Sequence, residues 1–162
     1  MGGTYTTVFE VSWFGDANLL KPLLFLSIGV MAVFTIGRRI GSDKKAPFEK
    51  WIFYCLWVPI WFGVTLPWLF STVRDTWRFR QALRYEQCAI VEGTVSVLYE
   101  QPGSGHASGD RIRIGDKEFV YSYFHETVAY HRTVAHGGAL INGATARLHY
   151  LADTILKVEV KQ

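Results

Sequence analysis

Two long apolar stretches, residues 19–37 and 51–72, lie in the first half of the chain, and the second half has nothing comparable. Both consist almost entirely of Leu, Phe, Val, Ile and Trp. Each is roughly twenty residues long, which is the length that a helix needs to cross about 30 Å of hydrocarbon. The sequence therefore predicts a membrane α-helical hairpin joined to one small polar domain.

The positions of these stretches predict the organisation of the whole chain. Residues 1–17 are expected to form an N-terminal interfacial segment, 18–37 the first transmembrane helix, 38–50 a basic loop, 51–72 the second transmembrane helix, 73–87 a juxtamembrane helix and 88–162 a soluble β-domain. The first stretch follows Glu10 and Asp16 and runs directly into Arg38 and Arg39. This pattern is typical of a retained helix rather than a cleaved signal peptide.

The second stretch is rich in aromatic residues and contains two prolines. Trp57 and Trp61 are four residues apart on one helical face, and they are expected to pack on a neighbouring helix or on lipid. Pro59 and Pro67 each lack a backbone N–H, so bends are expected one turn before each of them. Neither stretch contains Asp, Glu or His, which disfavours transport and proton relay.

Four arginines follow the second stretch, at Arg74, Arg78, Arg80 and Arg84. Their charge suits the phosphate-rich surface of a bilayer. They are interpreted either as a general juxtamembrane clamp or, more specifically, as a lipid head-group site. The net charge of +3 belongs mostly to these membrane flanks, and the polar domain shows no interleaved basic and aromatic run, which disfavours a nucleic-acid partner.

From residue 89 onward apolar and polar side chains alternate, as they do in half-buried strands. Five strands are expected, near residues 89–99, 111–114, 117–123, 144–150 and 155–160, with tight turns at Gly115-Asp116 and Ala152-Asp153. A domain of this size protects its strand edges by closure. The predicted fold class is therefore a membrane α-helical hairpin plus a small all-β domain, an OB-like or SH3-like barrel of about five strands.

Residues 124–140 interrupt the strand pattern and carry His125, His131 and His136, followed by Gly137-Gly138. Three imidazoles in one loop can hold zinc, but no cysteine accompanies them, so a structural loop with a positive-φ glycine turn is the favoured interpretation. No serine lies in a G-x-S-x-G motif, and no carboxylate is visibly paired with a histidine. We therefore expect no enzymatic activity, no metal and no cofactor. Nor do we expect a disulfide between Cys55, in an apolar stretch, and Cys88.

The polar domain contains a set of loose motifs: Val91-Glu92-Gly93-Thr94-Val95, residues 112–119, Tyr121-Ser122, His136-Gly137-Gly138, Gly143, Arg147, Tyr150 and Ile155-Leu156. In these motifs it resembles the β-domain of small uncharacterised bacterial two-helix membrane proteins of the DUF3592 type. The resemblance implies a β-domain beside transmembrane helices. It implies no activity and no catalytic residue.

Two classes of function follow, and both are kept. In the first, the chain is a non-enzymatic envelope module whose β-domain binds a protein partner or forms a homo-oligomer. In the second, the β-barrel senses a small ligand such as a cyclic nucleotide, and the architecture is similar to that of the two-helix-plus-barrel membrane effectors of antiphage signalling. The residues that could converge in a ligand cavity are Arg111, Arg113, Tyr121, Tyr123 and Arg147.

The basic residues on the two sides of the hairpin nearly balance. The loop carries Arg38, Arg39, Lys44, Lys45 and Lys50, and the opposite side carries Lys21 with the four arginines. The first helix usually dominates insertion, and its C-terminal flank is the more basic. We therefore expect a multi-pass protein of the bacterial inner membrane with its β-domain in the periplasm. An unpaired Cys88 leaves the cytoplasmic orientation as the alternative.

Overall fold

The computed structural model describes residues 4–15, 19–42, 47–104 and 107–162. The chain forms two compact units, which are treated separately below. A helical unit comprises Asp16–Arg74, and a β-unit comprises Met1–Gly15 together with Asp75–Gln162. The long third helix contributes residues to both units.

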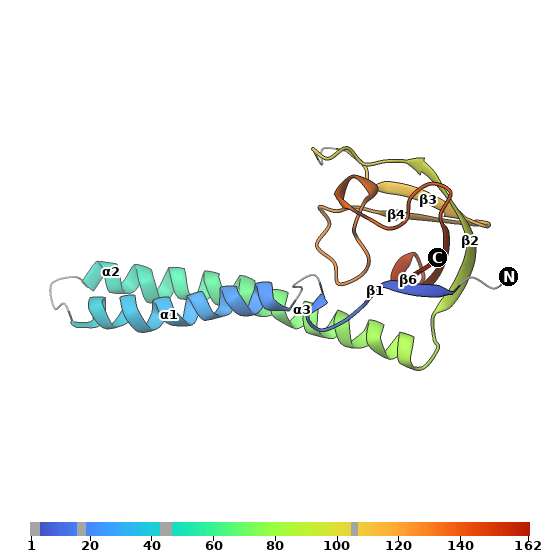
Figure 1. The fold of residues 1–162 in the computed structure, drawn as a ribbon. Coiled ribbons are helices and arrows are strands. Elements are labelled where there is room, and N and C mark those ends of the chain that lie inside the picture. Colours follow the sequence, from blue (N-terminus) through green and yellow to red (C-terminus); the bar gives the residue numbers. More distant parts are fainter. Residues whose placement is uncertain (1–3, 16–18, 43–46, 105–106) are drawn as a thin grey trace. The chain divides into compact units, whose positions relative to one another are not determined.

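The helical unit contains α1 (Leu20–Ser42), α2 (Pro47–Ile52), a π-helical segment η2 (Phe53–Trp57) and the first part of α3 (Val58–Arg84) (Figure 1). The helices α1 and α3 approach closely at Gly29, where a Cβ atom would lie 2.4 Å from Nε1 of Trp61. The Trp61 indole N–H donates to the carbonyl of Phe25 at 3.2 Å, and the Trp61 and Phe25 rings are stacked. The predicted packing on a neighbouring helix is confirmed for Trp61, which contacts α1, whereas Trp57 stacks on Phe53 and Trp61.

The π-helical segment lies where the sequence predicts a disturbance of the helix. Pro59 has no N–H to donate to the carbonyl one turn earlier, and a π-helical turn is one way to accommodate that loss. The helices are also longer than predicted. Arg38, Arg39 and Lys50 are helical, so the loop is shorter than residues 38–50, and Lys44 and Lys45 lie outside the described residues.

The β-unit contains one antiparallel sheet of six strands in the order β1-β6-β5-β2-β3-β4. The strands are β1 (Tyr5–Glu10), β2 (Ala89–Tyr99), β3 (Asp110–Ile114), β4 (Lys117–Tyr121), β5 (Thr145–Leu151) and β6 (Thr154–Lys161). All five predicted strands are present, and the two predicted turns join β3 to β4 and β5 to β6. The prediction of a closed barrel is not met, because β1 and β4 are unpaired edges of an open sheet.

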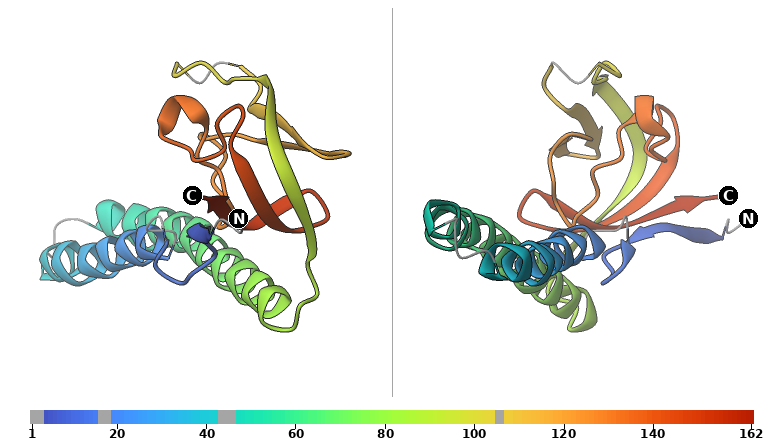
Figure 2. Two further views of the ribbon diagram at one scale, coloured as in Figure 1. Left: turned by 45° about the vertical axis from the view of Figure 1, so that its right-hand side comes forward. Right: turned by 90° about the vertical axis from the view of Figure 1, so that its left-hand side faces the viewer.

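Strand β2 bends the sheet around its core (Figure 2). Its first half, from Ala89 to Thr94, pairs with β5, and its second half, from Val95 to Tyr99, pairs with β3. The core between the two halves contains Ile112, Ile114, Phe119, Leu148 and Val158, all with at most 1% exposure. The loop between β4 and β5 adds Tyr130 and Leu140 to this core, and the Tyr130 N–H donates to the carbonyl of Ile155.

The prediction of an interfacial segment over residues 1–17 is wrong for Tyr5–Glu10, which form the edge strand β1 on β6. Phe9 packs against the main core, and Val11 is 1% exposed. The segment is too short for its alternation to stand out, and its partner strand lies at the other end of the chain. Phe9 and Val11 therefore pack on protein, although hydropathy alone suggested lipid contact, whereas Val8 and Phe14 are exposed.

A second, smaller core covers the outer face of the sheet. Val11, Ala82 and Leu156 are buried there, with Phe79, Leu83, Leu151 and Cys88 packed around them. The helix that supplies Ala82 ends at Arg84 with Glu86 at φ 54°, where Gln87 N–H donates to the Ala82 carbonyl and Glu86 N–H donates to the Leu83 carbonyl. This is a Schellman cap with glutamate in the position usually occupied by glycine.

A buried carboxylate holds two loops of the β-unit. Asp110 is 0% exposed and accepts the backbone N–H groups of Gln101 and Val134, both at 2.7 Å. Gln101 is also buried, and its side chain bonds to Ser122 and to the Ala107 carbonyl. Asp110 and Gln101 therefore connect the β2–β3 loop to the loop after β4 through buried hydrogen bonds.

Candidate functional site

A cavity of about 520 Å³ lies within the β-unit beside the last turns of α3. We call it the arginine–tryptophan pocket. Its lining residues are Glu10, Trp13, Trp77, Arg80, Gln81, Leu83, Arg84 and Tyr85. The volume is within the range of about 300–1,000 Å³ that is typical of small-molecule sites.

The helix side of the pocket follows from α-helical periodicity. Trp77, Arg80, Gln81 and Arg84 are spaced by three and four residues, so they share one face of α3. The opposite side comes from the N-terminus. After β1 the chain pairs Val11 N–H with the Leu156 carbonyl, and the residues from Glu10 to Trp13 pass alongside that helix face.

The pocket combines cationic and aromatic groups. The side chains of Arg80 and Arg84 have no hydrogen bond or ion pair with any other residue in the described parts of the chain. Glu10 is the single carboxylate among the lining residues, so the lining carries two positive charges and one negative charge. Guanidinium groups bind phosphate and carboxylate with paired donors, and indole rings favour the boundary between lipid and water.

The predicted lipid head-group residues are thus divided by the structure. Arg80 and Arg84 line the pocket, whereas Arg74 and Arg78 do not. Sequence reasoning missed Trp13 and Glu10 as pocket residues, because the predicted interfacial segment gave no reason to place them beside α3.

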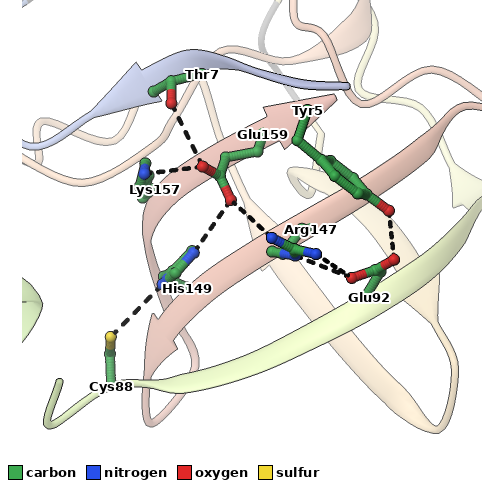
Figure 3. A network of polar contacts seen from close by, with 8 residues as sticks. All are labelled: Tyr5, Thr7, Cys88, Glu92, Arg147, His149, Lys157 and Glu159. Carbon is green, nitrogen blue, oxygen red and sulfur yellow. Dashed lines mark hydrogen bonds and ion pairs between the residues drawn. The ribbon is translucent and has the colours of Figure 1, made fainter. Parts of the chain in front are cut away.

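A polar network covers the outer face of strands β1, β6, β5 and β2 (Figure 3). Arg147 pairs with Glu92 at 2.8 Å and lies over the ring of Tyr5, whose hydroxyl donates to Glu92. The hydrogen bond from Tyr5 is the largest cause of the lowered pKa of Glu92, and the bond from Arg147 adds to it. These contacts connect the edge strand β1 to strands β2 and β5.

The same network continues to the other end of the strands. Glu159 accepts from Lys157 at 2.8 Å and lies 3.3 Å from Nε2 of His149. The Lys157 hydrogen bond is the main reason that the pKa of Glu159 is lowered, and His149 contributes as well. Nδ1 of His149, on the other side of the ring, lies 3.9 Å from the sulfur of Cys88. A histidine is therefore paired with a carboxylate, which the sequence did not reveal.

The five predicted ligand residues do not converge. Arg113 pairs with Glu118 on the outer face of β3 and β4, and Arg111 is exposed on the same face. Arg147 belongs to the outer face of β5, whereas Tyr121 is 8% exposed in the main core. Tyr123 stacks on His136 in the loop after β4, with ring centroids 3.9 Å apart.

A second cavity of about 310 Å³ does contain one of these residues. It lies between the end of β4, the following loop and the β5–β6 turn, and its lining includes Tyr121, Ser122, His125, His131 and Asp153. The buried hydroxyl of Tyr121 has no hydrogen-bond partner among the described residues. Burial raises the pKa of this phenol, so it is a neutral donor at physiological pH.

In the three-histidine loop, the side chains of His131 and His136 interact with neighbouring residues of the β-unit. His136 bonds to Thr133 and stacks on Tyr123, and Nδ1 of His131 is 3.0 Å from the Ala129 carbonyl. Gly137 has φ 76°, as predicted for the glycine turn. Among the described residues no group of three or more His, Cys, Asp or Glu side chains is arranged to hold a metal ion.

Comparison with known proteins adds no assignment: no protein-family model matches the chain, and no curated protein or solved structure matches it. The resemblance to the DUF3592 type therefore stays a prediction.

Proposed function

We propose that the protein is an integral, two-span membrane protein without enzymatic activity, and that its arginine–tryptophan pocket binds the anionic head group of a lipid. The pair of guanidinium groups without partners among the described residues, at the same pocket as two tryptophans, is the observation that carries this proposal. Cations left unpaired on a protein surface are available to an external anion.

Membrane attachment is supported by the helices themselves. Two helical segments, Leu20–Arg39 and Phe48–Arg84, are long and apolar enough to cross a membrane. Only 17% and 11% of their most apolar windows are buried within the chain, which argues against core helices of a water-soluble unit. Pocket residues Trp77, Arg80 and Arg84 follow the second apolar stretch on a continuous helix, a position that suits the head-group region.

The test is a titration of the full-length protein in neutral detergent with short-chain phosphatidylglycerol, in which tryptophan fluorescence reports binding. Short-chain phosphatidylcholine and glycerol 3-phosphate are the comparison ligands, which separate an anionic lipid from a zwitterionic lipid and from a free phosphate. We expect phosphatidylglycerol to bind and an Arg80→Gln, Arg84→Gln variant to bind about tenfold or more weakly, because each charge-assisted hydrogen bond contributes about 1.5–3 kcal/mol.

Arg74→Gln, Arg78→Gln is the matched control, because it removes the same number of charges from the same helix and neither residue lines the pocket. Equal losses in the control and in the pocket variant would mean that only general surface charge attracts the lipid, and the proposal would be wrong. The same conclusion would follow from equal binding of all three ligands.

The proposed setting is the bacterial inner membrane with the β-unit on the periplasmic side, where it can bind an envelope protein or a second copy of the chain. A cysteine placed at the exposed Ser108, in a Cys88→Ser, Cys55→Ser background, reports the orientation. Labelling by a membrane-impermeant maleimide in intact spheroplasts supports this side, whereas protection until lysis would reverse it.

A second function is favoured by the smaller cavity. We propose as the alternative that the β-unit is an OB-like sensor domain, since the order β6-β5-β2-β3-β4 is the strand order of an opened OB barrel. The cavity with the unpartnered Tyr121 hydroxyl lies where β4 and β6 leave that barrel open. No arginine or lysine is among its lining residues, so a neutral small ligand fits better than a cyclic nucleotide. A thermal-shift screen with neutral small ligands and cyclic nucleotides distinguishes these two ligand classes, because a true ligand raises the unfolding temperature.

A further inference from the structure

The side chains of Cys88, His149 and Glu159 form a row on the outer face of the sheet (Figure 3). The row is a product of strand register. Ile90 pairs with His149, so Cys88, two residues earlier, lies on the same face as the imidazole and diagonal to it. Arg147 pairs with Glu159, which places the carboxylate diagonal to His149 on the next strand.

The distances give each group a distinct chemical role. Nδ1 of His149 lies 3.9 Å from the Cys88 sulfur, and Nε2 lies 3.3 Å from Oε2 of Glu159. With its Nε2–H donated to the carboxylate, the ring presents the Nδ1 lone pair to the thiol. A nucleophile beside a base that is itself oriented by a third group is the arrangement that activates thiols.

The surroundings of the row are compatible with an ion pair. The side chains of His149 and Glu159 are only 19% and 13% exposed, and Cys88 is half-buried against the second core, which includes Ala82 and Leu83. The charged neighbours are Lys157, 2.8 Å from Glu159, and Arg147, 4.0 Å from Glu159 and 2.8 Å from Glu92. Moving one proton from sulfur to imidazole leaves the net charge of this set unchanged.

We propose that Cys88 is a reactive thiol site that exchanges with low-molecular-weight disulfides, with His149 as its base and Glu159 as the positioning residue. The Cys88 proton moves to Nδ1 of His149, and the thiolate attacks one sulfur of the disulfide. A new bond forms between that sulfur and Cys88 while the original S–S bond breaks. The departing thiolate then accepts this proton from His149. One disulfide and one thiol thus yield one mixed disulfide and one thiol.

The test uses the full-length chain in detergent with Cys55→Ser, which leaves Cys88 as the single cysteine. Oxidised glutathione is the probe, and intact mass follows the rate of mixed-disulfide formation between pH 5.5 and 9. We expect His149→Gln to slow the exchange at pH 7 about tenfold, because an unassisted thiol with a pKa of about 8.5 is only slightly ionised there. His136→Gln is the control, because this histidine interacts with Thr133 and Tyr123 and not with Cys88, and it should leave the rate unchanged.

The pH profile separates activation from a structural role. In the parent protein the exchange rate should change little between pH 7 and 9, whereas in His149→Gln it should rise with pH as it does for an unassisted thiol. Glu159→Gln keeps the shape of the side chain and should slow the exchange by a smaller factor. A parent rate that rises with pH as steeply as the rate of free cysteine would overturn the proposal even if His149→Gln failed to fold.

Discussion

The helical unit and the β-unit bury their apolar side chains in different ways. In the β-unit Ile112, Ile114 and Leu148 are 0% exposed inside a core that the unit makes for itself. In the helical unit Phe34 and Phe70 are 62% and 67% exposed, and Phe25 of α1 packs on Trp61 and Trp68 of α3. The β-unit therefore carries its own apolar interior, whereas the helices leave most of their apolar windows exposed. The two units should respond to different perturbations.

The largest expected effect concerns the helices. The full chain should stay in the membrane pellet during alkaline carbonate extraction, because two inserted spans are effectively irreversibly bound. Arginines introduced at the exposed mid-span positions Val30 and Val64 should shift protein out of the pellet, since each costs about 2.5–3.5 kcal/mol at a helix centre. Recovery of the parent chain in the carbonate supernatant would remove the contrast between the two units.

A change at the buried Asp110, which connects two loops, should destabilise only the β-unit. Asp110→Ala leaves two buried N–H groups, on Gln101 and Val134, without their acceptor, and should cost about 3 kcal/mol of unfolding free energy. Urea unfolding followed by far-UV circular dichroism at the β-sheet signal measures the loss. The exposed Glu100→Ala is the control, with little expected change. A loss of similar size in the control would contradict the role of Asp110.

A smaller effect of opposite sign is expected at the end of α3. Glu86 has φ 54°, a conformation that costs a non-glycine residue about 1–2 kcal/mol. Glu86→Gly should therefore raise the unfolding free energy of the β-unit, by about 1 kcal/mol after the entropy of the unfolded glycine is included. The neighbouring Gln87→Gly should bring no gain, since its φ is not positive. An equal gain in both variants would point to the unfolded state instead.

The smallest effect is the pH dependence of the polar network. The pKa of Glu159 is lowered from 4.5, chiefly by its hydrogen bond with Lys157. A carboxyl group with a lowered folded-state pKa stabilises the fold above its unfolded pKa, and this contribution is lost as the pH falls through the folded value. The unfolding temperature should therefore fall less between pH 6 and 3 in Glu159→Gln than in the parent. Identical pH dependence in the two proteins would show that the network contributes nothing to stability.

Features with local causes could be predicted from the sequence. Gly115-Asp116 and Ala152-Asp153 form the expected two-residue turns, with Gly115 and Ala152 at positive φ. Pro59 predicted the irregular helix now seen as the π-helical segment. For the candidate pocket, helical spacing was enough to place Arg80 and Arg84 together on one side.

Contacts between distant segments could not be predicted in this way. The hydroxyl of Thr7 bonds to Glu159 across 152 residues of sequence, and Cys88 meets His149 across 61. Alternation indicates which strand residues share a face, but it does not indicate which strand is the neighbour or in which register it pairs. The proposed ligand residues therefore lie in four different places: the outer face of β3 and β4, the outer face of β5, the main core and the loop after β4.

The sequence by itself determined two apolar helices, the five strands from residue 89 onward and the turns between them, because each depends on side chains a few positions apart. Only the tertiary structure decided that residues 5–10 form a sixth strand on β6, that Trp13 joins Arg80 and Arg84, and that His149 lies between a thiol and a carboxylate. The physical reason is that strand pairing and register depend on long-range packing of the core, which no local pattern of residues specifies.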